Sequence, residues 1–138
     1  MGAILVKSCK RIKEEHKKLL PDLFADSYDT LVYPLEHCLE FYDKDGLVGA
    51  MRIEYRDPRL SKKFKPVFSL WIYYFEIRPE KRKMGYGKKI VEYIKHSLPI
   101  YRIELTNWNE DCMKFWWAQG FRKPDKYSNT LVKRVRKI

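Results

Sequence analysis

Apolar runs in the middle of the chain predict a set of β-strands. Each run is either almost wholly apolar or alternates apolar with polar side chains, as the strands of a packed sheet do. The dipeptide Asp45-Gly46 lies between the first two runs and is typical of a tight hairpin turn. The strands predicted in this way are residues 35–42, 47–55, 67–77 and 100–106.

Two later segments have the period of an amphipathic helix. Residues 87–97 repeat apolar side chains every four positions, and residues 109–119 predict a second helix that ends at Gly120 as a C-cap. The side chains predicted to face inward are Ile90, Ile94 and Leu98 in the first helix and Cys112, Phe115 and Trp116 in the second.

The remaining segments complete the order of elements. Residues 3–6 predict a short edge strand, and Ser8 predicts the N-cap of a helix that Pro21 interrupts. The polar and basic residues 56–66 predict an exposed loop, and residues 121–135 predict a last hairpin. Strands and helices therefore mix along the chain, which indicates a mixed α/β (α+β) domain with a central sheet.

Composition places the chain among small globular proteins. At 138 residues and 45% hydrophobic content, we expect a single domain over residues 1–138 with one core. No segment is long and apolar enough to span a bilayer and the start lacks a signal-peptide pattern, so we expect a cytoplasmic protein without a membrane partner. The three cysteines and three histidines are scattered, which predicts reduced thiols and no metal site.

Positive charge is concentrated in the second half of the chain. Residues 1–70 contain 13 Lys/Arg against 11 Asp/Glu, a net charge of +2, whereas residues 71–138 contain 16 against 7, a net charge of +9. Such a balance suits a polyanionic ligand, and it also fits a nucleic-acid or acidic-protein partner. For the basic tail at 133–137, simple solubility is an equal alternative.

The segment between the predicted strand 67–77 and the helix 87–97 predicts an anion site. It contains the pattern Arg82-x-x-Gly85-x-Gly87, in which glycines let backbone N–H groups approach a ligand beside a helix N-terminus. The spacing does not match a Walker phosphate loop or a three-glycine dinucleotide fingerprint. A solvated basic turn is the alternative. The cations around this loop are Arg78, Lys81, Arg82, Lys83, Lys88 and Lys89.

Two motifs resemble those of the GNAT superfamily of N-acetyltransferases. Arg82-x-x-Gly85-x-Gly87, preceded by Ile77-Arg-Pro79, is similar to the family's acetyl-CoA pyrophosphate loop. The pattern from Asn109 through Cys112, Phe115 and Trp116 to Gly120-Phe121 is similar to a second family signature. The resemblance covers nearly the whole chain and implies a mixed, mostly antiparallel sheet flanked by helices.

The resemblance also implies an activity. A primary amine would attack the thioester of acetyl-CoA, the acyl donor, without a metal. The acceptor stays open between a small amine and an amine on a protein or an aminoacyl-RNA, and the chain is expected to be a monomer or a homodimer. Two alternatives are an acyl-CoA-binding module with little catalysis and a small basic nucleic-acid-binding protein. The residues implied to contact the cofactor are Phe75, Ile77, Arg82, Lys83, Met84, Gly85, Tyr86, Gly87, Lys88, Asn109 and Phe115.

The catalytic groups are less determined. Trp116 occupies the position where many family members have the tyrosine that protonates the leaving thiolate, and an indole N–H is too weak an acid for this. Tyr73 or Tyr74 is the alternative acid, with Tyr86, Tyr127 and water as further alternatives. Glu76 is the candidate base, and an ion pair with a neighbouring Arg or Lys is the alternative for this carboxylate. Strict alternation predicts Tyr73, Phe75 and Ile77 on one face of the strand and Ile72, Tyr74 and Glu76 on the other. Rival bases are Glu36, Glu40 and Glu54, and candidate acceptor-binding residues are Tyr28, Tyr33 and Tyr127.

Overall fold

The computed structural model describes residues 3–9, 14–20, 36–60, 66–106 and 110–135. The described strands are β1 (Leu5–Cys9), β2 (Glu36–Asp43), β3 (Gly46–Leu60), β4 (Pro66–Ile77), β5 (Ile100–Thr106) and β6 (Thr130–Arg134). The described helices are α1 (Glu14–Lys17), α2 (Tyr86–Ser97) and α3 (Glu110–Ala118), and a 3-10 turn, η1, covers Pro79–Lys81.

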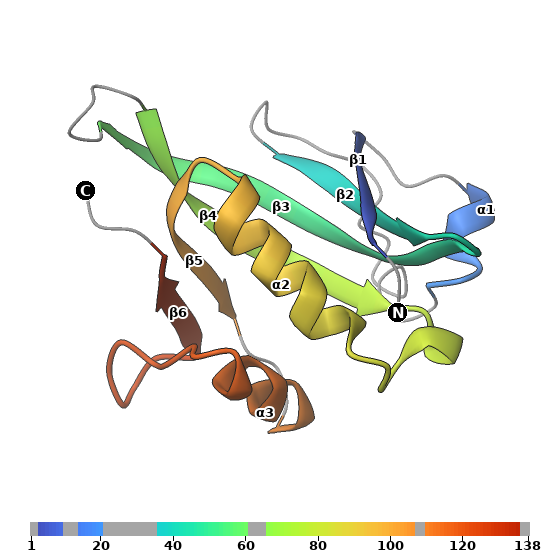
Figure 1. Cartoon of the computed structure of the whole chain (residues 1–138). Helices are drawn as coiled ribbons and strands as arrows, with labels where there is room; N and C mark the ends of the chain where they lie inside the picture. Colours follow the sequence, from blue (N-terminus) through green and yellow to red (C-terminus); the bar gives the residue numbers. More distant parts are fainter. Residues whose placement is uncertain (1–2, 10–13, 21–35, 61–65, 107–109, 136–138) are drawn as a thin grey trace.

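The strands form one six-stranded sheet in the order of the sequence, β1-β2-β3-β4-β5-β6 (Figure 1). Neighbouring strands are antiparallel except β4 and β5, which are parallel. A parallel pair needs a crossover connection, and α2 supplies it by lying across one face of the sheet (Figure 1). This mixed, mostly antiparallel sheet with helices confirms the predicted fold class.

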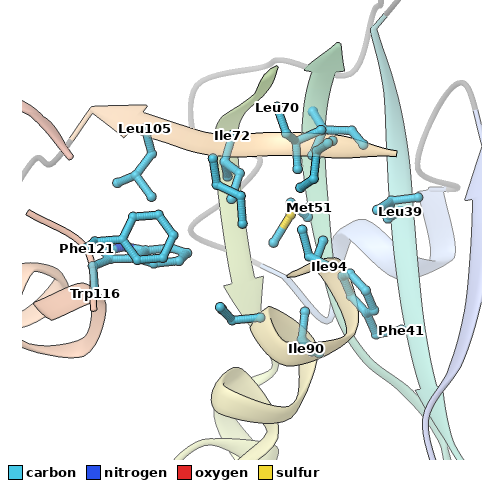
Figure 2. Close-up of a cluster of buried hydrophobic side chains, with 14 of the residues drawn as sticks. Leu39, Phe41, Met51, Leu70, Ile72, Ile90, Ile94, Leu105, Trp116 and Phe121 are labelled. Carbon is cyan, nitrogen blue, oxygen red and sulfur yellow. The ribbon is translucent and has the colours of Figure 1, made fainter. Parts of the chain in front are cut away.

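The main core lies between α2 and the sheet. Ile90 and Ile94 of α2 pack with side chains of β2, β3 and β4, as Figure 2 shows. Trp116 and Phe121 extend the same cluster beside Leu105 of β5 (Figure 2). This burial explains the amphipathic pattern of 87–97, because the apolar stripe of α2 is the part that meets the sheet.

A smaller apolar cluster covers the opposite face of the sheet. It contains Leu20, which follows α1, together with Cys38, Leu47 and Ala50 from β2 and β3. Tyr74 of β4 packs against this cluster from its edge. None of the helices within the described ranges is long and apolar enough to cross a membrane.

Three predictions about local structure are wrong. Ser8 is not a helix N-cap, because the predicted edge strand, present as β1, begins at Leu5 and continues to Cys9, which places Ser8 opposite Leu39 of β2. Residues 56–60 are not a loop but continue β3, since ladder pairing with β4 satisfies the backbone of this polar segment. Cys112 is exposed, because α3 meets the core only in its second half.

Candidate functional site

An extra residue in β4 changes which side chains share a face. Arg52 of β3 lies opposite Tyr74, but the next residue, Ile53, lies opposite Ile72. Tyr73 is therefore the inserted residue of a β-bulge. The predicted alternation is wrong beyond this point, because Ile72 packs in the same core cluster as Phe75 and Ile77.

The sheet divides just after the bulge. Pairing of β4 with β5 ends at Ile72 opposite Leu105, although β4 continues to Ile77. The N–H of Arg78 donates to the carbonyl of Val48 over 2.8 Å, on the β3 side. Backbone groups alternate in direction along an antiparallel strand, so those of Phe75 and Ile77 point to the other side, where β5 has separated. This edge can receive a ligand that lies between the two strands.

The loop that follows β4 ends at a helix N-terminus that no side chain caps. Lys83 and Gly85 both have a left-handed backbone, with φ of 62° and 86°. Gly85 is the N-cap residue of α2, no side chain caps it, and the first turn of α2 contains no acid. The first N–H groups of a helix have no partner within the helix and carry its positive dipole end, so this turn favours an anion.

A cleft of about 320 Å³ lies between this loop and α3. Gly87 is one of the lining residues, and a Cβ at this position would lie 2.8 Å from Cε1 of Phe115, so that the ring or α3 would have to shift. The glycine thus allows α3 to approach the start of α2. The residues that line the cleft are Ile77, Lys81, Arg82, Lys83, Gly85, Tyr86, Gly87, Lys88, Phe115 and Gln119.

Arg82 ties the loop to the end of β4. Its Nε donates to the carbonyl of Ile77 over 2.8 Å, and its Nη2 donates to Oε2 of Glu76 over 3.2 Å. The Glu76 side chain is only 5% exposed, so the guanidinium provides the charge partner that a buried carboxylate needs. The predicted base Glu76 is thus an ion-pair partner of Arg82 in the structure.

The other cations of the loop divide into two groups. Arg78 is paired with Glu80 at 3.0 Å, and Lys81 is paired with Asp43 at 2.8 Å. Lys83 and Lys88, in contrast, are exposed at the cleft. The positive charge presented to a ligand there therefore comes mainly from Lys83, Lys88, the half-exposed Arg82 and the N-terminus of α2.

Asp43, at the end of β2, supports the loop from outside it. Its Oδ2 accepts hydrogen bonds from Nζ of Lys81 and from the hydroxyl of Tyr86, over 2.8 and 2.6 Å. These bonds, that of Lys81 first, hold the pKa of the Asp43 carboxyl well below its usual range. In turn, the hydrogen bond that each donor makes to Asp43 raises the pKa of Lys81 and the pKa of Tyr86. The sequence showed Asp43 only as part of a hairpin turn, since nothing local links it to a loop 38 residues later.

The predicted acids occupy different environments. Trp116 is buried and packs edge-on against Phe115 and Phe121, with ring centroids 4.9 and 5.0 Å apart. The Tyr73 hydroxyl accepts a hydrogen bond from Nη2 of Arg56 over 2.7 Å on the face away from α2. Tyr74 lies on that face too, against the smaller cluster. Both tyrosines therefore stand at the bulge, next to the point where β5 separates.

Other predicted residues lie elsewhere. Tyr127 is 84% exposed on the segment between α3 and β6 and is not among the residues that line the cleft at the start of α2. Glu40 is buried, with its carboxylate 2.5 Å from Nδ1 of His16. Glu54 pairs with Arg56. Asn109, Tyr28 and Tyr33 lie outside the described residues, as does the side chain of Glu36.

Known structures share this fold at low sequence identity. The KacTA–DNA complex superposes with a TM-score of 0.62 at 14% identity, covering 96% of this chain and 94% of that one. AtaT complexed with acetyl-methionyl-tRNAfMet gives a TM-score of 0.58 at 11% identity, covering 96% and 95%. AtaTR bound with acetyl-CoA gives 0.54 at 15% identity, covering 73% and 71%. These similarities establish the fold. No curated protein sequence matches the chain.

A family model also matches the sequence itself. It covers residues 7–121, which include the bulged strand, the loop, the start of α2 and all of α3. The chain belongs to the acetyltransferase (GNAT) family.

Proposed function

We propose that this acetyltransferase moves an acetyl group from acetyl-CoA to a primary amine by direct attack on the thioester. One observation carries the proposal. The backbone edge of Phe75 and Ile77 opens where β4 and β5 separate, directly beside the cleft at the N-terminus of α2. One elongated molecule with a pyrophosphate at one end and a thioester at the other fits both features.

The chain's own groups suit the two ends of this substrate. The N–H groups of the first turn of α2 and the cations of Lys83 and Lys88 would hold the pyrophosphate. The Phe75 N–H, at the open edge of β4, would donate to the thioester carbonyl as negative charge develops on its oxygen. The amine nitrogen then bonds to the carbonyl carbon, the carbon–sulfur bond breaks, and the sulfur leaves with the electron pair.

Two protons must move in this reaction. The acceptor arrives as an ammonium and must lose a proton, for which Glu76 is our candidate because it is the acid of β4 beside the division of the sheet. In this proposal its carboxylate leaves the ion pair with Arg82 when it accepts the proton. The leaving sulfur must gain a proton, for which we propose Tyr73 or Tyr74 at the bulge as the donor, and that tyrosine regains a proton from the nitrogen, which loses its second proton as the amide forms. Tyr73→Phe and Tyr74→Phe distinguish the two candidates, because only the variant that removes the hydroxyl of the proton donor should have a lower kcat.

We further propose that the acceptor amine belongs to an aminoacyl group carried on RNA. The excess of 16 Lys/Arg over 7 Asp/Glu in residues 71–138 suits a polyanionic acceptor. AtaT, which shares the fold, is known in complex with acetyl-methionyl-tRNAfMet. Both observations favour an RNA-linked amine over a small free amine.

Calorimetry with acetyl-CoA, followed by thiol release with a panel of acceptors, tests the proposal. We expect acetyl-CoA to bind and thiol release to be faster with aminoacyl-tRNA than with free amino acids or peptides. Absence of acetyl-CoA binding would overturn the whole proposal. Binding with transfer only to small amines or peptides would overturn the RNA-linked acceptor alone.

A second candidate, an acyl-CoA-binding domain with little catalysis, is favoured by one observation. Trp116 is buried among aromatic rings and has no acidic hydroxyl. This candidate predicts acetyl-CoA binding without thiol release above the uncatalysed rate for any acceptor in the panel.

A further inference from the structure

An exposed strip along α3 and the segment that leads to β6 combines cations with aromatic rings. We call it the α3–β6 surface. Over residues 110–127 the described side chains include four exposed cations against the two exposed acids Glu110 and Asp125. The members of the surface are Lys114, Trp117, Arg122, Lys123, Lys126 and Tyr127.

The two rings of this surface are unusually exposed. Trp117 is 47% exposed and Tyr127 is 84% exposed, whereas Trp116 on the same helix is buried. Both rings are therefore available for contact with another molecule.

Cations are placed over both rings. The guanidinium of Arg122 lies 5.3 Å from the centroid of Trp117, and the ammonium of Lys126 lies 5.0 Å from that of Tyr127. Arg122 is also held in place, because its Nη1 donates to the carbonyls of Trp117 and Phe121 over 3.0 and 2.6 Å. The ring and guanidinium therefore form an ordered pair of flat surfaces.

We propose that the α3–β6 surface binds the single-stranded end of the RNA that carries the acceptor amine. This inference rests on the proposed RNA-linked acceptor. Unpaired bases stack on aromatic rings and on guanidinium planes, while Lys and Arg neutralise the phosphates between them. An acidic peptide would need the cations but not the exposed rings.

The position of the surface fits this use. Phe115 and Gln119 line the cofactor cleft, and Trp117 lies between them in sequence but is exposed to solvent. In Figure 1, α3 and the segment that follows it lie at one end of the molecule, at the β6 edge of the sheet. RNA bound here would leave the cleft to the pyrophosphate, and its end would extend toward the open edge of β4, where we propose that the thioester lies.

Fluorescence anisotropy with a labelled single-stranded RNA of about 12 nucleotides, titrated with the full chain, tests the surface. We expect Trp117→Ala and Tyr127→Ala each to weaken binding roughly tenfold, as loss of one stacked base does. Arg122→Gln should reduce the slope of log affinity against log salt by about one. Lys18→Gln, an exposed lysine that follows α1, is the control and should cause no comparable loss.

Several results would overturn the inference. These are no RNA binding by the parent protein at low salt, losses from the ring variants no larger than that of Lys18→Gln, or equal binding of poly-glutamate with equal sensitivity to the ring variants. The measurement needs neither acetyl-CoA nor transfer. Failure of acetyl transfer with intact, ring-dependent RNA binding would thus reject the proposed function and leave the surface in place.

Discussion

The carboxylate of Asp43 accepts a hydrogen bond from the hydroxyl of Tyr86 over 2.6 Å, joining the β2–β3 hairpin to the first residue of α2. The same oxygen accepts from Lys81 in η1. Asp43 therefore fixes both sides of the loop that we propose binds the pyrophosphate. It acts on the ligand only through these two residues, as a positioning residue.

Asp43→Asn should weaken acetyl-CoA binding several-fold. The amide removes the charge partner of Lys81 and offers a weaker acceptor to Tyr86, so the loop loses its fixed geometry. Calorimetry measures the dissociation constant. Asp45→Asn is a matched control, because Asp45 is 66% exposed and lies 3.7 Å from the same lysine. Equal losses of acetyl-CoA affinity in the two variants would mean that affinity depends on the net charge near the loop and not on the hydrogen bonds of Asp43.

The stabilising effect of Asp43 should depend on pH in one direction. Because the folded pKa of its carboxyl is lowered, its contribution is complete above the ordinary aspartate pKa of about 4 and is lost as the pH falls through the folded value. Urea unfolding of the parent and Asp43→Asn at pH 7, 5 and 3 checks this. The difference in unfolding free energy should be similar at the two higher pH values and smaller at the lowest. A difference that grows on acidification would contradict the assignment.

Much of the sheet could be predicted from sequence because its signals are local. The hairpin followed from Asp45-Gly46, and α2 followed from a four-residue apolar repeat that the sheet buries. The extension of β3 to Leu60 could not be predicted in this way. Its polar residues are held by pairing with β4, which is a contact between distant segments.

The candidate site also has features that the sequence predicts and features that it does not. The sequence pattern marked both glycines of the loop. The structure gives the reason for each, since Gly85 has φ of 86° and Gly87 faces Phe115. The bulge at Tyr73 depends on the register between β3 and β4, and no local pattern marks it. One inserted residue moved Ile72 to the face predicted for Phe75, which is why strict alternation failed.

Gly87→Ala should lower both stability and acetyl-CoA affinity. The new methyl group would lie 2.8 Å from Cε1 of Phe115, so α3 or the ring must move. Overpacking of this kind costs about 1–3 kcal/mol. Thermal unfolding and calorimetry measure the two effects.

Phe115→Leu provides the matching test for this steric conflict. The smaller side chain should relieve the clash, so the double variant should be more stable than the sum of the single effects predicts. Additive losses would mean that the ring is not what excludes a side chain at Gly87.

Trp116→Tyr and Trp116→Phe together test what the indole replaces. Both variants leave space beside Phe75 and Phe121, and each should lose about 1–2 kcal/mol of unfolding free energy.

The two variants differ by one hydroxyl. If position 116 borders the leaving sulfur, only the tyrosine supplies a proton donor of suitable acidity, and its kcat should exceed that of the phenylalanine variant by about tenfold. Steady-state thiol release with one fixed acceptor measures this. Equal kcat values would place the leaving sulfur away from position 116 and leave Tyr73 and Tyr74 as the candidate acids.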